Sequence, residues 1–452
     1  MNQSFFAALI LAMIPALTRG QTDTILIDQY DLEGVVISAD KRENRVMEVP
    51  ASATSLSGFA VESERIRATT DLTGPVPNLY MPDYGSRLTS PIYIRGIGSR
   101  INSPSVGFYI DEVALFEKAT FHFDMYDIQR IEVLRGPQGT LYGRNTMGGI
   151  VHVITREPDN RFGLKMLAEA GSYGQQQYQL KTGGPLVSDR LFAQVNGFYR
   201  ARNGFHSNEF TGSRVDHLKS GGGRIKLIFR PGAATRLTWQ MYGDMSHEGG
   251  YPYAVVPEDD EDLTIGYDHE SSYRRDLTGT SLRAERTGDR VVLHSITAFQ
   301  TFRGAQDIDQ DFTPLSLLWV TQDQDQQLFT QEFRINNATA GGPFRWIAGA
   351  YGFYQVNDQQ VGVTYGEDGI AAFGLPYSSY SYVKQSDMTN YGAALFGQGS
   401  LNDLLMEGME LTLGVRVDYE KDRLDFTYDR TANGTLSRAD EFASDFDFFE
   451  IL

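Results

Sequence analysis

From about residue 161 onward, the sequence alternates apolar and polar side chains over runs that often reach ten residues or more. In the run 411–420 one face carries Leu411, Leu413, Val415, Val417 and Tyr419. A period of two is that of a strand with one apolar and one polar face. Soluble β-sandwiches show the same alternation, but their strands usually have five or six residues. Longer runs whose polar faces carry opposite charges, as at Glu332 and Arg334, favour an antiparallel transmembrane β-barrel with a wet lumen.

One other segment is apolar enough to interact with a membrane, and it lies at the N-terminus. Residues 5–17 are apolar and are interrupted by Pro15. This is shorter than the roughly 20 residues of a membrane-spanning helix but matches the apolar region of a signal peptide. We therefore predict a signal peptide over residues 1–20, with cleavage before Gln21. Residues 1–4 lack the usual Lys or Arg, and a buried N-terminal helix is the alternative.

The composition narrows the possible functions. The 452 residues include no cysteine, which excludes disulfides and thiolate metal sites. The formal net charge of -18 argues against nucleic acid as a partner. The 24 Tyr, 27 Phe and 46 Gly suit long strands, tight turns and the aromatic girdles of membrane barrels.

Two glycine-containing stretches and one aspartate-rich stretch partly match known nucleotide-binding and calcium-binding motifs, but each lacks a required residue. The stretch 131–156 predicts a strand, glycine-punctuated turns and a second strand. It lacks the Lys that follows the last Gly of a phosphate-binding loop, and residues 96–98 lack the third Gly of a dinucleotide fingerprint. Asp307, Asp309 and Asp311 resemble the start of a calcium loop, but Phe312 occupies the position that requires Gly. The seven His are scattered, and no catalytic set is visible. We expect no enzyme activity, no cofactor and no metal.

The stretch 131–156 closely resembles the end of the plug domain of TonB-dependent outer-membrane receptors. Residues 92–100 resemble the earlier Ile-Arg-Gly motif of the plug, and residues 105–113 resemble its strand ending in Tyr-x-Asp-x-Val. Residues 32–39 look like the TonB box, the segment that pairs with TonB. Residues 331–335 and 346–354 resemble early barrel strands. The resemblance implies a periplasmic segment over 21–45, a small α+β plug over 46–158 and the N-terminal part of a barrel over 159–452.

The resemblance also implies roles for individual residues. The TonB box comprises Glu33, Gly34, Val35, Val36, Ile37 and Ser38, and its partner is TonB of the TonB–ExbB–ExbD complex. We expect Arg95, Arg135 and Arg144 of the plug to meet barrel carboxylates, with Glu332 as a lumen-facing partner. The ligand-binding candidates at the plug apices are Tyr84, Arg100, Asn102 and Phe116.

A member of this family is a multi-pass barrel of the outer membrane that imports a scarce ligand. Only about ten residues separate the cleavage site from the TonB box. This leaves no room for the extra N-terminal domains of regulatory receptors or of large glycan importers, which favours an iron–siderophore complex as the ligand. Cobalamin, a glycan or another chelate, and a passive barrel channel, are the alternatives. We mark ten or eleven strands against the family's 22, so we expect the native chain to continue beyond Leu452. The sequence does not specify the oligomeric state.

Overall fold

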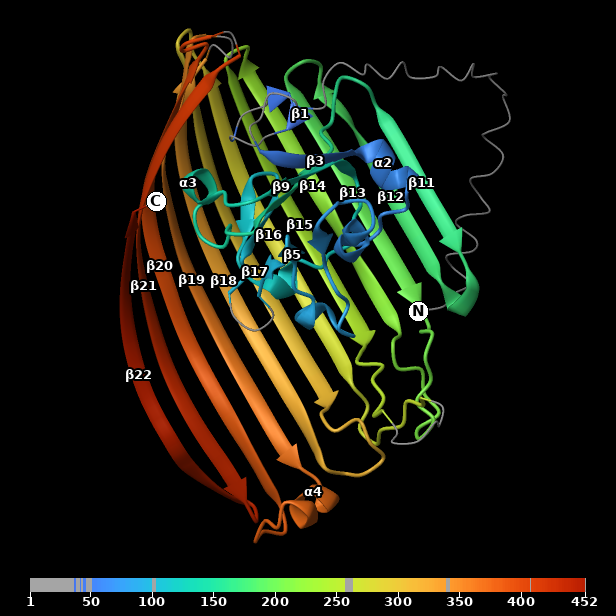
Figure 1. Ribbon diagram of the computed structural model, residues 1–452. Coiled ribbons are helices and arrows are strands. Elements are labelled where there is room, and N and C mark those ends of the chain that lie inside the picture. The colour runs from blue at the N-terminus through green and yellow to red at the C-terminus, as the bar shows by residue number, and fades with distance from the viewer. Residues whose placement is uncertain are drawn as a thin grey trace, which may run out of the picture.

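The computed structural model describes residues 36–37, 41, 44–45, 51–99, 103–256, 263–338, 342–406 and 408–451. The predicted signal peptide and the TonB-box residues Glu33, Gly34, Val35 and Ser38 lie outside these residues. Within the described residues, no helix is both long enough and apolar enough to cross a bilayer. Figure 1 shows a small domain seated on the concave side of one large curved sheet.

The small domain is built on a five-stranded sheet with the order β3-β9-β10-β7-β8. Its strands are β3 (Ser52–Ser57), β7 (Val106–Ile110), β8 (Val113–Leu115), β9 (Ile128–Arg135) and β10 (Gly149–Thr155). A second sheet contains β4 (Leu79–Tyr80), β5 (Tyr93–Ile94) and β6 (Ile97–Gly98). The helices are α2 (Gly58–Ser63) and α3 (Gly139–Tyr142), with 3-10 turns at Thr69–Thr73, Arg87–Thr89 and Lys118–Thr120. β10 pairs antiparallel with β9 and parallel with β7. The stretch 131–156, which contains most of β9 and all of β10, therefore lies in the middle of the five-stranded sheet.

This domain has its own apolar core. Phe108, Ile131, Val133, Val151 and Val153 are fully buried between the five-stranded sheet and the turns that cover it. Gly149 begins β10 with a φ of +138°, and a Cβ atom there would lie 2.1 Å from the carbonyl oxygen of Leu134. Only glycine tolerates that approach at this backbone angle. A glycine at this position therefore allows β9 and β10 to pair.

The large sheet contains twelve antiparallel strands whose order follows the sequence from β11 to β22. The strands are β11 (Gly163–Ala170), β12 (Gln176–Val187), β13 (Leu191–Arg202), β14 (Leu218–Gly232), β15 (Thr235–Gly249), β16 (Ser272–Thr287), β17 (Val291–Asp309), β18 (Leu318–Asn337), β19 (Phe344–Tyr365), β20 (Tyr380–Asn402), β21 (Glu410–Ala432) and β22 (Thr435–Ile451). They lengthen from 8 residues in β11 to 23 in β20 and β21. The prediction of a small α+β plug with long antiparallel barrel strands is confirmed, and twelve strands are present among the described residues where the sequence suggested ten or eleven.

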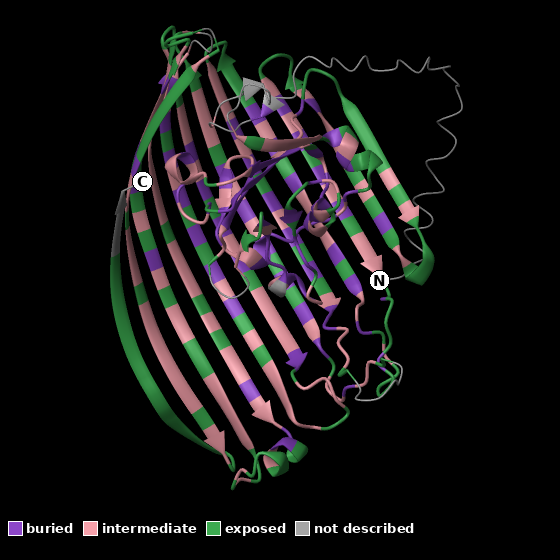
Figure 2. Ribbon diagram, in the orientation of Figure 1, coloured by how far each residue is buried: buried purple, intermediate pink, exposed green. Residues whose placement is uncertain are grey.

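The two faces of the large sheet have opposite character, as the alternation predicted. On β18, Glu332 and Arg334 face the plug and are buried, whereas Phe329 and Phe333 point away from it and are 44% and 56% exposed. Figure 2 shows this banding along many of the strands. The polar face is thus the covered one, and the exposed face is largely apolar, which is the reverse of a soluble sheet and is typical of a barrel in lipid.

The two ends of the sheet also differ. At one end the connections are short, as between β14 and β15 or between β16 and β17. At the other end most are longer, as between β13 and β14, between β15 and β16, and between β19 and β20, where α4 (Glu367–Ala372) lies, although only two residues join β21 and β22 there. Outer-membrane barrels have short periplasmic turns and longer extracellular loops. We refer to these as the short-turn end and the long-loop end. The N-terminal strand β1 (Val36–Ile37) lies toward the short-turn end (Figure 1).

Candidate functional site at the plug–barrel interface

The described part of the N-terminal segment, residues 36–37, 41 and 44–45, is packed against the plug. β1 pairs antiparallel with β2 (Asn44–Arg45). The Ile37 side chain is fully buried and packs with Tyr109, Leu134 and Ile150. Two of the six predicted TonB-box residues, Val36 and Ile37, therefore form a strand that is docked on the plug.

Lys41 brings this segment into contact with the barrel wall. Its Nζ atom lies 2.8 and 2.7 Å from the two carboxylate oxygens of Glu332 on β18. The ammonium also lies over the rings of Tyr142 and Phe396, at 5.2 and 5.0 Å from their centroids. Burial lowers the pKa of Lys41 to about 8, although the Glu332 carboxylate opposes the shift. The charge of Lys41 is thus costly to bury and depends on Glu332 as its counter-ion.

Glu332 continues into a chain of charged side chains that enters the plug. Arg334 donates a hydrogen bond of 3.1 Å to Glu332 and pairs with the carboxylate of Glu112. Glu112 also accepts a 2.7 Å bond from Arg283 on β16. Burial alone raises the pKa of Glu112, but Arg334 and Arg283 hold it well below its usual range. We call Lys41, Glu332, Arg334 and Glu112 the ion-pair chain; it joins the N-terminal segment to the turn between β7 and β8.

Asp111 lies beside Glu112 in the same turn, and both have positive φ angles, +48° and +71°. The Asp111 carboxylate lies 3.2 Å from Lys226 Nζ and accepts bonds of 2.8 and 2.6 Å from the Thr155 amide and hydroxyl. Burial raises its pKa, but Lys226 and Arg224 more than offset this and bring it to about 2. The turn is therefore held by barrel cations on both of its carboxylates.

Two further plug carboxylates repeat this arrangement. Asp124 lies 3.2 Å from Arg200 of β13 and accepts a 2.5 Å bond from Ser220. Asp127 lies 2.5 Å from Lys181 Nζ and accepts a 2.7 Å bond from Asn196.

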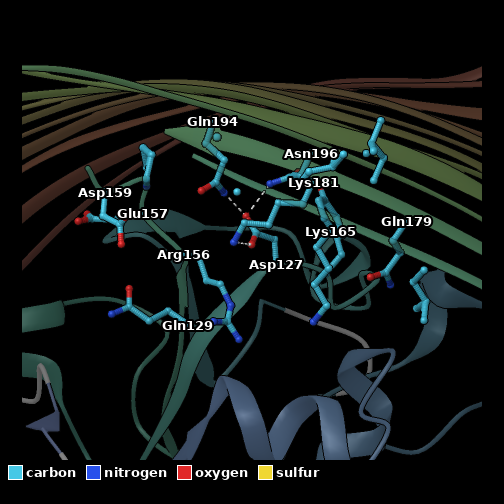
Figure 3. Close-up of a pocket in the computed structure, with 18 of the residues that line it drawn as sticks. Asp127, Gln129, Arg156, Glu157, Asp159, Lys165, Gln179, Lys181, Gln194 and Asn196 are labelled. Carbon is cyan, nitrogen blue, oxygen red and sulfur yellow. Dashed lines mark hydrogen bonds and ion pairs between the residues drawn. The ribbon is translucent and has the colours of Figure 1, made fainter. Parts of the chain in front are cut away.

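Figure 3 shows Asp127 with Lys181, Gln194 and Asn196 in a cavity of about 530 Å³ between the plug and β11–β13. Within the described residues, no group of His, Asp or Glu side chains is arranged to hold a metal ion.

These contacts correct the predicted polarity of the interface. Arg144 does meet a barrel carboxylate, Glu420, at 2.7 Å. Arg135 instead bonds within the plug, to Ser52 at 3.0 Å and Thr54 at 2.6 Å. Its position at the end of β9, beside β3, turns its side chain toward the plug's own edge strand.

Arg95 does not reach the barrel either. It is exposed in the turn between β5 and β6 and forms no ion pair with any described residue. Glu332 does face the plug, but its partners among the described residues are Lys41 and Arg334 rather than Arg95 or Arg135. At most of the interface the plug supplies the carboxylates and the barrel supplies the cations.

Of the four predicted ligand-binding residues, Tyr84 and Phe116 are among the residues that the structure describes. Arg100 and Asn102 lie outside the described residues. The Tyr84 carbonyl accepts a 2.6 Å hydrogen bond from the hydroxyl of Tyr253, which lies in the long connection between β15 and β16. Phe116 is buried and packs against Phe353 of β19 with ring centroids 5.2 Å apart.

The sequence reasoning did not single out the aromatic side chains beside Tyr84. Tyr253 packs on Phe312 at 4.9 Å and on Tyr251 at 6.0 Å between ring centroids, at the long-loop end. Tyr251 and Tyr253 lie between β15 and β16, whereas Phe312 lies between β17 and β18, so no local pattern marks the cluster. The plug carboxylates had a weak signal, because Asp111 and Glu112 form a charged pair between two short apolar strands.

A small α+β domain seated on the polar face of long antiparallel strands, whose outer face is apolar, defines a plugged barrel of the outer membrane. Residues 45–150 match the family described as the TonB-dependent receptor plug domain. Residues 45–150 are thus a plug domain of the TonB-dependent receptors, and the chain has the fold of a plugged outer-membrane barrel.

Among known proteins, the chain is 27% identical over 344 residues to the pesticin receptor of Yersinia pestis, covering 74% of this chain and 46% of that receptor. It is 31% identical over 180 residues to a vitamin B12 transporter of Vibrio vulnificus, covering 39% of this chain and 28% of the transporter. The crystal structure of the ferric yersiniabactin uptake receptor of Yersinia pestis superposes with a TM-score of 0.74 at 22% identity, over 89% of this chain and 61% of that one. The chain thus spans under half the length of these curated relatives, which are named as receptors and transporters.

Proposed function

We propose that the protein imports a ferric siderophore complex across the outer membrane, driven by TonB of the TonB–ExbB–ExbD complex. The observation that carries the proposal is the docking of the N-terminal segment on the plug, with Lys41 paired to Glu332 of the barrel wall. An extended segment with β-branched residues can add a strand to a partner's sheet once it is released. The outer membrane has no ATP of its own, so a pull on such a segment is a means of doing work on the plug.

The ligand class rests on two observations. The superposed structure is that of a ferric yersiniabactin uptake receptor. The aromatic side chains of Tyr251, Tyr253 and Phe312 gather at the long-loop end beside the plug loop that contains Tyr84. Aromatic faces suit a planar, partly apolar chelate. The similarity to a vitamin B12 transporter makes cobalamin the alternative cargo.

The ion-pair chain suggests how ligand arrival is transmitted. The β7–β8 hairpin carries Glu112 at its turn, and its second strand leads into Phe116, which packs on Phe353 and under Arg144. A shift of this hairpin toward a bound ligand moves Glu112 away from Arg334. Arg334 is then free to take a larger share of Glu332, which leaves the buried Lys41 ammonium without its counter-ion. Such a coupling between two sites needs this kind of differential contact in the two states.

Transport is tested with the full-length receptor in cells with and without TonB. We expect radiolabelled iron to enter as the siderophore complex only when TonB and the proton-motive force are present, while surface binding persists without them. Equal uptake in both strains would indicate a passive channel and overturn the proposal. Uptake of labelled cobalamin, with no uptake of the iron complex, would assign the other cargo.

The coupling step is tested with Glu332→Gln, using Asp325→Asn as the matched control. Asp325 lies on the same strand but on the outward face, where it pairs with Arg303 at 2.8 Å. We expect Glu332→Gln to strand the Lys41 ammonium and release the N-terminal segment, so that TonB is captured without ligand. The control should capture TonB only with ligand. Ligand-dependent capture by both variants would remove Lys41–Glu332 from the mechanism.

A further inference from the structure

Three basic side chains form a row on the outward face of the barrel. Lys219 of β14 lies directly opposite His247 of β15, and His247 lies directly opposite Arg274 of β16. All three are exposed, and none forms an ion pair or hydrogen bond with a described carboxylate. We call these residues the cationic row. Lys219 and Arg274 flank His247 on its two neighbouring strands, so an anion lying over the row would meet two permanent positive charges.

Other cations on the same outward face do have partners in the chain. Arg303 lies 2.8 Å from Asp325, and Arg423 lies 3.1 Å from Asp425. The cationic row is instead extended by further basic groups. The ring of His217 packs on that of His247 with centroids 5.7 Å apart, and a cavity of about 510 Å³ beside it is lined by Arg202, Arg214 and Lys219. The basic side chains are therefore gathered at this place and not scattered over the surface.

The height of the row in the membrane follows from the strands themselves. The outward positions of β14 carry Phe229, Leu227 and Ile225 and then two glycines, and those of β15 carry Leu237, Trp239 and Met241. The run from Phe229 to Gly221 has nine residues, and a tilted strand needs about 9–11 to cross the hydrocarbon core. Lys219 is the next outward position, toward the long-loop end. The row lies where the apolar band ends and the headgroups of the outer leaflet begin.

We propose that the cationic row binds the phosphate groups of a phosphorylated lipid of the outer leaflet, with its acyl chains against the apolar band of β14 and β15. Lys219 and Arg274 supply two permanent charges about two strand spacings apart, roughly 10 Å, which suits a headgroup that carries more than one phosphate. Arginine and lysine donate charge-assisted hydrogen bonds to phosphate oxygens. The lipid phosphates supply the negative charge that the row does not have from a described carboxylate, and the interaction fixes this side of the barrel in the outer leaflet.

The test measures lipid retention by the full-length receptor purified from nanodiscs that contain diphosphoryl lipid A in phosphatidylcholine. The triple variant Lys219→Gln, His247→Gln, Arg274→Gln is compared with the double variant Arg303→Gln, Arg423→Gln, whose cations face outward but are already paired. Native mass spectrometry counts the lipid A molecules that stay bound. We expect the triple variant to lose at least about tenfold in retention and the double variant to match the wild type.

A second pair of measurements separates charge from fold. The exchange variant Lys219→Arg, Arg274→Lys keeps both charges and should retain lipid A, and all variants should unfold at the same temperature in neutral detergent without lipid. Equal retention of lipid A by the triple variant and the wild type overturns the proposal. Equal loss in the Arg303→Gln, Arg423→Gln control overturns it as well, because the effect would then be a general response to surface charge.

Discussion

Asp111→Asn is expected to loosen the plug at neutral pH, because Asp111 is the buried counter-ion of Lys226. The substitution keeps the size of the side chain and one carbonyl oxygen, which can accept one of the two bonds that the Thr155 amide and hydroxyl donate to separate carboxylate oxygens. It removes the charge that lies 3.2 Å from the Lys226 ammonium, whose side chain is only 3% exposed. The Lys226 ammonium can still donate hydrogen bonds to the Thr155 hydroxyl and to the carbonyl oxygens of Thr155 and Arg156, but it no longer has a carboxylate partner at this contact.

The magnitude follows from the pKa of Asp111. Its fall from 3.8 to about 2 corresponds to roughly 2 kcal/mol of preference for the charged form in the folded protein. Stranding the buried ammonium raises the cost toward the 3–5 kcal/mol typical of a broken buried pair. Because the folded pKa is lowered, this contribution is fully present above pH 3.8 and is lost as the pH falls through about 2. The difference between wild type and variant should therefore vanish in strong acid.

Hydrogen exchange of the β7 and β10 amides in the full-length receptor measures the effect. We expect exchange at least about 30-fold faster at pH 7 in the variant, the equivalent of roughly 2 kcal/mol. Asp159→Asn is the control, since Asp159 is an exposed carboxylate that accepts one bond from the Arg161 amide. Exchange that is unchanged in Asp111→Asn, or equally fast in the control, would refute the assignment of Asp111 as an anchor of the plug.

Three other changes test the N-terminal segment and the plug core. Lys41→Met removes an ammonium whose pKa is lowered to about 8 by burial. Because the docked segment then no longer buries a charge, the Ile37 amide should become more protected from hydrogen exchange. Weaker protection would contradict this. In the wild type, docking should strengthen as the pH rises from about 8 toward 10.5, because the docked form then binds fewer protons, and the Met variant should lose that dependence. Val36→Pro removes a backbone donor from β1, so uptake should fail while surface binding of ligand persists; normal uptake would refute the role of this strand. Gly149→Ala should destabilise the plug by at least about 2 kcal/mol, since its Cβ would meet the Leu134 carbonyl oxygen at 2.1 Å. Barrel strands that assemble normally, with fast exchange confined to β9 and β10, are the expected readout.

The sequence alone determined which face of each barrel strand is polar. Side chains alternate across any extended backbone, so the faces at Phe329, Glu332 and Phe333 were fixed before any strand pairing was known. It also determined the centre of the plug, because the stretch 131–156 predicted a strand, glycine-punctuated turns and a second strand, and β9 and β10 are found there. These are local properties, and the structure has them where the pattern put them.

Only the tertiary structure decided which charges meet. Lys41 pairs with Glu332 across 291 positions of sequence, and Glu112 pairs with Arg334 across 222. The sequence suggested that Arg95, Arg135 and Arg144 of the plug meet barrel carboxylates. Of these three, only Arg144 does so among the described residues, whereas Arg135 bonds within the plug. The partner of a buried charge depends on the rotation of the plug within the barrel and on the stagger of the strands. Neither is encoded in the spacing of residues along one strand, so the polarity of the interface emerged only when the two domains were placed together.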